Sequence, residues 1–213
     1  MDDHGAGQQS GGGGRSKRCL VLTLAVVLGL APVALSFFLT LKTALGWDQN
    51  LLGNGGFEEG TSGWGVSYGA TFITVTEPVS SGNWAAALNR TDIPAQIYFH
   101  QYVPVIAGAT YTLTGWIYKD EPAFTYALLR IEWWPLGQPT VDSGQIRDDN
   151  DFYRPVTVGP ATAPPGAYKA RIVGLADIRT SPPPNPVYFD DLSFTSNMMP
   201  IGFLPLSLKN YPR

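Results

Sequence analysis

Two short stretches of the sequence carry aromatic and charged residues at every second position. In TYTLTGWIY (110–118) and YALLRIEWW (126–134) the odd-numbered positions are mostly apolar and suit a core. Successive side chains of a strand point to opposite faces of its sheet, so the even-numbered ones face away from that core. These outward positions carry Trp116, Tyr118, Tyr126, Arg130, Glu132 and Trp134. Large exposed rings beside hydrogen-bonding groups predict a binding surface.

The residues on which most enzymes depend are scarce. His100 is the only histidine after the N-terminal tail, and its place within YFHQY favours a strand position over a role in a Ser-His-Asp triad. Cys19 is the single cysteine, which essentially excludes disulfides and cysteine–histidine zinc sites. Glu132 could face Asp120 or Glu121 across a cleft, as glycoside hydrolysis requires, but nothing singles these pairs out. We therefore expect no enzymatic activity.

Composition and turn chemistry indicate the fold. The chain has 213 residues and a formal net charge of −3, whereas a nucleic-acid partner usually requires a basic stripe. After residue 47, short runs rich in β-branched and aromatic residues alternate with turns such as SSGN, APPGA and SPPPNP. This pattern predicts an all-β, antiparallel sandwich of the jelly-roll type over residues 47–195, followed by a C-terminal tail at 196–213.

The N-terminal part differs from this pattern. Residues 1–18 are rich in Gly, Ser and Gln and are predicted to be disordered. Residues 19–46 begin with a long uncharged apolar run, preceded by three basic residues within 15–18. Such a run predicts one hydrophobic helix, either a cleaved secretory signal peptide or a transmembrane anchor. In both cases we expect the chain after Trp47 to be exported, and so secreted or anchored at the cell surface.

Four motifs follow one another along the predicted sandwich. They are NLLGNGGFEEGTSGW (50–64), AGATYTLTGWIYK (107–119), APPGAYKARI (163–172) and VYFDDLSF (187–194). In this order and spacing they resemble carbohydrate-binding modules of the family 4/9 type, which belong to the galactose-binding-like jelly rolls. The resemblance covers about residues 49–195 and implies the same fold there.

The resemblance also implies a structural calcium ion that joins the first motif to the last. Carried over by position, Glu58 and Asp190 would supply carboxylates, with backbone carbonyls near Gly56 and Asn83. Calcium takes about six to eight oxygen ligands, which such groups provide. Independently of the family, acids from two ends of a domain that meet repel each other unless a cation lies between them. Alternation with Leu192 predicts that Asp190 points inward; the plainer interpretation is that these acids are solvated.

On such a fold the outward rings predict a non-catalytic carbohydrate-binding module of an exported bacterial surface protein. A pyranose needs an aromatic platform, flanked by hydrogen-bonding groups for its hydroxyls. The candidates are Trp116 and Trp134 as platforms, Tyr118 and Tyr126 as rim, Arg130 and Glu132 as hydrogen-bonding groups, and Trp84 at the edge. The alternative is a structural block of a cell envelope or filament that self-associates through the same face. The expected partners are thus a glycan and, if the N-terminal helix is uncleaved, a membrane.

Overall fold

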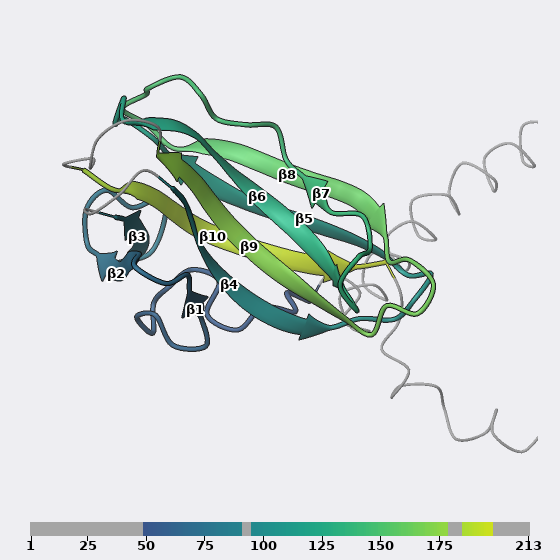
Figure 1. The fold of residues 1–213 in the computed structure, drawn as a ribbon. Helices are drawn as coiled ribbons and strands as arrows, with labels where there is room; N and C mark the ends of the chain where they lie inside the picture. Colours follow the sequence, from purple (N-terminus) through teal and green to yellow (C-terminus); the bar gives the residue numbers. More distant parts are fainter. Residues whose placement is uncertain (1–48, 91–94, 179–184, 198–213) are drawn as a thin grey trace, which may run out of the picture. The chain divides into compact units, whose positions relative to one another are not determined.

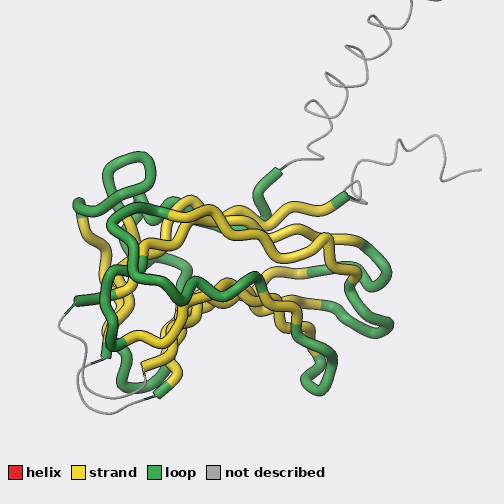
Figure 2. Tube along the Cα trace, turned by 90° about the horizontal axis from the view of Figure 1, so that it is seen from above, coloured by secondary structure: helices red, strands yellow, loops and turns green. Residues whose placement is uncertain are grey.

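The computed structural model describes residues 49–90, 95–178 and 185–197, which form two antiparallel β-sheets packed face to face (Figures 1 and 2). The predicted all-β antiparallel sandwich is confirmed for these residues, none of which is helical. Within these three ranges there is consequently no helix that could cross a membrane. The expected N-terminal helix, the tail at 1–18 and most of the tail at 196–213 lie outside the described residues.

Each sheet has five strands, and we name the sheets after their central strands. The β9 sheet has the order β1-β4-β9-β6-β7, and the β10 sheet has the order β2-β3-β10-β5-β8. The strands of the β9 sheet are β1 (Gly65–Val66), β4 (Gln96–Pro104), β9 (Lys169–Ile178), β6 (Phe124–Trp134) and β7 (Val141–Asp142). Those of the β10 sheet are β2 (Thr71–Val75), β3 (Ala85–Asn89), β10 (Val187–Ser196), β5 (Thr110–Tyr118) and β8 (Arg154–Thr162).

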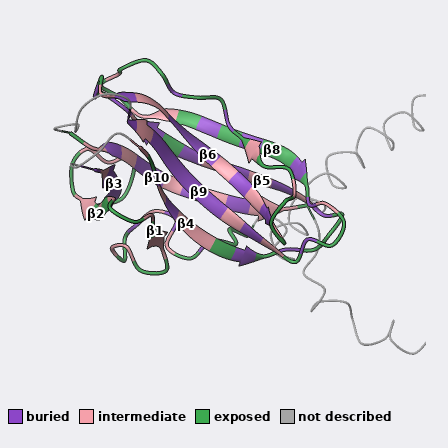
Figure 3. Cartoon of the chain, in the orientation of Figure 1, coloured by how far each residue is buried: buried purple, intermediate pink, exposed green. Residues whose placement is uncertain are grey.

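The core fills the space between the two sheets. The alternation predicted for β5 and β6 is confirmed, because Leu113, Ile117, Leu129 and Ile131 are each 0% exposed. Burying a large apolar side chain of this kind stabilises the fold by about 1.5–3 kcal/mol. The buried residues run along the middle of both sheets, whereas exposed residues gather at the edges and loops (Figure 3).

The first described segment lies beside the last strand. The Leu51 amide donates to the Phe194 carbonyl at 2.8 Å, and the Leu192 amide donates to the Gly55 carbonyl at 2.8 Å. The Asn50 side chain adds two bonds, donating to the Leu192 carbonyl at 2.9 Å and accepting from the Phe194 amide at 2.9 Å. A Cβ atom on Gly55 would overlap the Leu192 carbonyl, so this approach requires glycine. The two ends of the domain therefore meet, as the position of the acids had suggested.

Candidate ligand-binding faces

The predicted glycan-binding residues do not share one surface. Trp116 and Tyr118 belong to β5 in the β10 sheet, whereas the four candidates on β6 belong to the β9 sheet. The two strands face each other across the core, with the Cβ position of Gly115 only 3.0 Å from a methyl carbon of Leu129. Their outward side chains therefore point in opposite directions. The prediction of a single aromatic face is wrong, because alternation separates inward from outward without revealing which sheet a strand joins.

The outer side of the β9 sheet, which we call the β9 face, is formed by β4, β9 and β6. Its cross-strand rows join Tyr102 to Arg171 and Glu132, and Pro104 to Lys169 and Trp134. The outward residues with rings or charges are Tyr98, His100, Tyr102, Tyr126, Arg130, Glu132, Trp134, Lys169 and Arg171. Three strands thus contribute to a surface for which the sequence had indicated only β6.

An aromatic clamp stands at one end of the β9 face. The Lys169 ammonium lies 4.5 Å from the centre of the Tyr102 ring and 4.7 Å from that of the Trp134 ring. The two rings are 6.0 Å apart and nearly perpendicular, with an interplanar angle of 73°. Trp134 Nε1 is buried and has no hydrogen-bond partner among the described residues. An unpaired buried donor costs about 1–3 kcal/mol, and because this N–H is buried, a ligand reaches it only if neighbouring side chains move.

Paired charges fix the polar groups beside the clamp. Arg171 forms an ion pair with Glu132, with Nε donating to Oε2 at 2.7 Å. Arg130 donates to both carboxylate oxygens of Asp142, at 2.6 and 2.9 Å. Bidentate pairs of this kind hold their side chains in a defined geometry. The guanidinium N–H groups that remain free can donate to a ligand from fixed positions.

His100 lies in the middle of β4, at the side of the β9 face next to β1, and the predicted strand position is thereby confirmed. Its ring is 5.9 Å from that of Tyr98 and 5.3 Å from that of Tyr102. Burial, and then the charge of Arg171, lower the pKa of His100, while Glu132 opposes them. The imidazole is therefore neutral at pH 7, and its buried Nδ1 has no partner among the described residues.

The opposite end of the β9 face is closed by apolar packing. Leu128, Val173 and Leu175 point outward, yet each is at most 2% exposed because Tyr98 and Tyr126 pack against them. The Tyr126 hydroxyl also accepts a hydrogen bond from the Gln96 side chain at 2.8 Å. Tyr126 therefore covers a local apolar cluster at the rim, away from the clamp.

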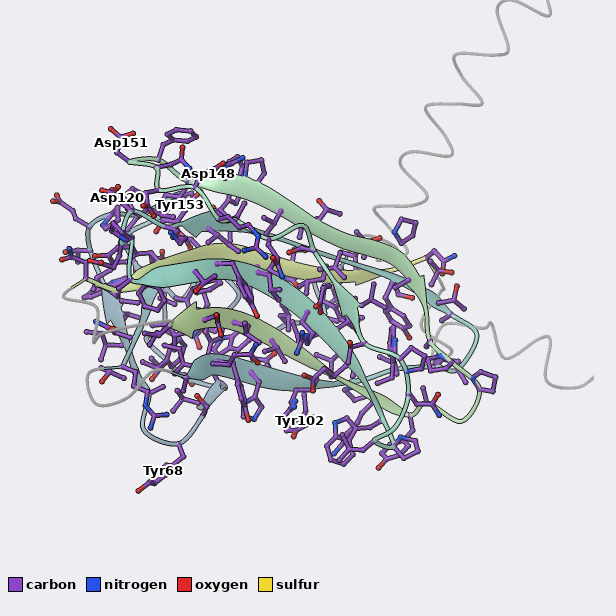
Figure 4. The ribbon with its side chains drawn as sticks, turned by 45° about the horizontal axis from the view of Figure 1, so that its top comes forward. Tyr68, Tyr102, Asp120, Asp148, Asp151 and Tyr153 are labelled. Carbon is purple, nitrogen blue, oxygen red and sulfur yellow. The ribbon has the colours of Figure 1, made fainter. Side chains whose placement is uncertain are left out.

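A second concave surface lies on the other side of the sandwich. Trp116 and Tyr118 line a cavity of about 440 Å³ with residues 78–80 and 151–153. Tyr153, Asp151 and Asp120 gather at this end, on the side of the molecule opposite Tyr102 (Figure 4). We call this cavity the β10 pocket.

The acids proposed for calcium hold one loop from two sides. Glu58 Oε1 accepts hydrogen bonds from the amides of Asn83, at 2.8 Å, and Trp84, at 3.1 Å. Asp190 Oδ2 accepts from the amides of Ser80, at 2.8 Å, and Ser81, at 3.2 Å. Trp84 is thereby placed in this loop and is 38% exposed. The acids thus meet through the loop that spans residues 80–84.

Asp190 is buried by a different route from the one predicted. It pairs directly with Trp116 on β5, and directly opposite residues share a face, so both lie on the outer side of the β10 sheet. The register shifts between Asp190 and Ser193, which breaks the alternation with Leu192. The predicted inward direction is therefore wrong, and the overlying loop makes Asp190 0% exposed. Burial raises the pKa of this carboxyl, and the three hydrogen bonds that it accepts from backbone amides oppose that effect.

The hydrogen-bond donors around these acids show how far the proposed ligands could form a calcium site. Gly56 lies beside Asp191, whose Oδ1 is 3.8 Å from the Cβ position of that glycine and accepts a bond from the Ser81 hydroxyl at 2.7 Å. Asn83 lies beside Glu58. Of the proposed ligands, Glu58 and Asn83 therefore lie together, whereas Gly56 lies beside Asp191, and the carboxylates of Glu58 and Asp190 both face N–H donors. In the described ranges no three His, Cys, Asp or Glu side chains are grouped to hold a metal ion. A carboxylate can accept about four bonds, so lone pairs remain on each acid.

No protein-family model matches the sequence, and no curated protein sequence matches it. Solved structures share the fold. Family 16 Carbohydrate Binding Module-2 has 21% identity and a TM-score of 0.53, over 68% of this chain and 99% of that one. The C-terminal family 22 carbohydrate-binding module of Clostridium thermocellum Xyn10B has 13% identity and a TM-score of 0.54, over 74% of this chain and 98% of that one.

Enzymes share this fold as well. The enzymatically active domain of bacteriophage CBA120 tailspike protein 4 has 19% identity and a TM-score of 0.56. The alignment covers 69% of this chain, which spans only 21% of the tailspike domain. A Stig cyclase from Fischerella also has a similar structure. The chain therefore has the β-sandwich fold of carbohydrate-binding modules, a fold on which catalysis also occurs.

Proposed function

We propose that this chain is a non-catalytic carbohydrate-binding module that binds a glycan on the β9 face. The observation that supports this most directly is the clamp of Tyr102 and Trp134 around Lys169, with the fixed side chains of Arg130 and Arg171 on the same face. The names of the similar family 16 and family 22 modules agree with a glycan as the ligand. The order and spacing of the four motifs support, as a further part of this proposal, a module of the family 4/9 type.

In this proposal the rings and the fixed polar groups have separate roles. The apolar face of a pyranose packs on Trp134 and Tyr102, and the ring hydroxyls bond to His100 and the free N–H groups of Arg171 and Arg130. Glu132 and Asp142, the carboxylates beside the clamp, are each paired with an arginine, so neither is free to act as a general acid or base. This arrangement favours binding over hydrolysis.

The proposal is tested by titrating the full chain with xylo-, cello- and galacto-oligosaccharides while tryptophan fluorescence is recorded. We expect at least one series to bind and Trp134→Ala to weaken that binding about tenfold or more, since a buried aromatic anchor is worth about 2 kcal/mol. Trp116→Ala, on the opposite side, is the matched control and should bind normally. If only Trp116→Ala loses binding, the glycan site lies on the β10 sheet and not on the β9 face. If shorter sugars are released from the oligosaccharides, the chain is an enzyme.

Calcium forms a second part of the proposal, with Glu58 and Asp190 as carboxylate ligands and the carbonyls of Gly56 and Asn83 nearby. It is supported by the remaining lone pairs and by the convergence of these acids on one loop. A bound ion stabilises the folded state, so calcium should raise the melting temperature and a chelator should lower it. If the melting temperature changes with neither calcium nor chelator, these acids bind no calcium and serve only to hold the loop through hydrogen bonds to its backbone amides.

Export is the third part, and residues 19–46 would direct it as a signal peptide or an anchor. Fractionation of a bacterial host that expresses the full chain tests this point. We expect the chain outside the cytoplasm, in the soluble fraction if residues 19–46 are removed and in the membrane fraction if they are retained. A structural building block would instead ignore all sugars and form concentration-dependent assemblies.

A further inference from the structure

We infer that the β10 pocket is a second ligand site, and that it binds a sugar unit carrying a protonated amine. It lies on the opposite side of the sandwich from the β9 face and uses none of the residues of that face. The inference therefore does not depend on the binding proposed above.

The walls of the β10 pocket are fixed by a hydrogen bond and by an ion pair whose lysine is buried. The Tyr153 hydroxyl donates to the Pro78 carbonyl at 2.8 Å and so joins the two loops that form the walls. Burial, and then the charge of Asp190, raise the pKa of Tyr153, so the phenol keeps the proton that it donates. Asp149 pairs with Lys119, which is 1% exposed, and this contact ties the loop to the end of β5. The cavity is thus built into the fold.

The walls that face solvent are aromatic. Trp116 is 37% exposed and Phe152 is 55% exposed, and Tyr118 lies between the rings of Tyr153 and Tyr188, at 5.6 and 5.5 Å. A volume of about 440 Å³ is within the range of about 300–1,000 Å³ typical of small-ligand sites. Flat rings at this spacing can hold the apolar side of a pyranose.

The charges around these rings are acidic. Asp151 lines the cavity, and Asp120 lines an adjoining space of about 240 Å³ that shares Pro78 and Tyr118. The neighbouring cations are already engaged, Lys119 with Asp149 and Arg154 with Asp148 at 3.7 Å. Asp120 and Asp151 form no ion pair with any described residue. Carboxylates without a cation beside exposed rings are the groups that bind an ammonium, through charge and through cation–π attraction.

Asp120 and Asp151 both act on the phenol of Tyr118, which lines both spaces. Burial first, and then the charges of Asp120 and Asp151, raise the pKa of its phenol. The adjoining space is also lined by Asn185 and Tyr188, whose amide and hydroxyl groups suit sugar hydroxyls. A simple alkylammonium would leave these polar groups unused, which favours an amine on a sugar ring.

The test compares two tetrasaccharides of the same backbone, one with free, charged amines and one with acetylated, neutral ones. The full chain is titrated calorimetrically, in mildly acidic buffer, with the β-1,4-linked tetramer of glucosamine and with the same tetramer fully N-acetylated. We expect the amine form to bind about tenfold more tightly or better, because acetylation removes the charge. Asp120→Asn combined with Asp151→Asn should abolish this preference, and Trp116→Ala should weaken the binding.

Controls separate the site from general electrostatics. Glu59→Gln removes an exposed acid elsewhere and should keep the preference, and Trp134→Ala should keep it as well. Near-ultraviolet circular dichroism checks that every variant is folded. The inference is overturned if the two tetramers bind alike, if the double variant retains the preference, or if Trp134→Ala abolishes it. Equal competition by tetramethylammonium or a lysine peptide would overturn the assignment to a sugar.

Discussion

The Lys169 ammonium lies 4.7 Å from the centre of the Trp134 ring, in the same cross-strand row of the β9 sheet. Among the described residues Lys169 has no carboxylate partner, whereas Arg130 and Arg171 on the same face are both paired. The attraction between the cation and the ring quadrupole holds the clamp in place and leaves one positive charge free for a ligand.

The free charge leads to a prediction about glycan selectivity. Lys169→Met keeps most of the apolar stem of the side chain but removes the charge. We expect the affinity for glycans that carry uronic acids to fall about tenfold or more, with a smaller change for neutral ones, because a charge-assisted hydrogen bond is worth about 1.5–3 kcal/mol. Titration of both glycan types checks this. An equal loss for both would show that Lys169 acts only through packing.

The lowered pKa of His100 predicts a change of stability with pH. The unfolded state, with a pKa near 6.5, takes up the proton first as pH falls, while the folded state resists it. Stability should therefore fall as pH drops through 6.5 towards the pKa of the folded state, and should be unaffected by this residue at higher pH. Urea unfolding of the wild type and of His100→Gln at several pH values checks this, since the free energy of unfolding of the variant should fall less steeply as pH drops below 6.5. Identical slopes would contradict it.

The loop held by Glu58 provides a test with a closely matched control. Gly82 and Gly60 both have φ of 66°, so alanine strains the backbone at each by about 1–3 kcal/mol. A Cβ on Gly82 would also overlap Glu58 Oε1, whereas that of Gly60 meets nothing within 4 Å. Gly82→Ala should therefore melt at a lower temperature than Gly60→Ala, because Glu58 must release the amides of Asn83 and Trp84. Equal melting temperatures would mean that this anchor contributes nothing.

The ion pair of Lys119 and Asp149 predicts strong coupling between the two residues. Asp149→Asn leaves the Lys119 charge buried without its partner and should lower the free energy of unfolding by about 2–3 kcal/mol. This is less than for a fully buried pair, because the side chain of Asp149 is 37% exposed. Adding Lys119→Met should recover part of the loss. Denaturant unfolding of the single and double variants measures the coupling, and strict additivity would contradict it.

Local patterns in the sequence predicted the strands better than they predicted the site. Period-two alternation correctly placed Leu129 in the core and Trp134 outside it. It could not show that β5 and β6 lie in different sheets, because sheet order depends on contacts between distant strands. The same alternation in QIYFHQYVP marks Tyr98, His100 and Tyr102 as outward, and these residues complete the β9 face. That signal was present, but without the neighbour order nothing linked it to β6.

The acids show the complementary case. The motifs indicated that Glu58 and Asp190 belong to one region, and both do hold the loop at 80–84. The sequence did not reveal that backbone amides would face them, because the path of that loop depends on the positive φ of Gly82 and on the bulge in β10. The glycine in SSGN marks a turn, but a single sequence shows neither the path of that turn nor the bulge.

The antiparallel contact between residues 50–55 and β10 determines how the domain responds to tension. Asn50 and Leu51 lie close to one end of the described fold and are bonded to Phe194, close to the other, so a force that pulls on both ends loads these hydrogen bonds first. The hydrogen bond between Leu192 and Gly55 is loaded only after the bonds nearer the ends have broken, so the segment separates from β10 one bond at a time. A module tethered at both ends would therefore extend slightly under low load while its two sheets stay intact.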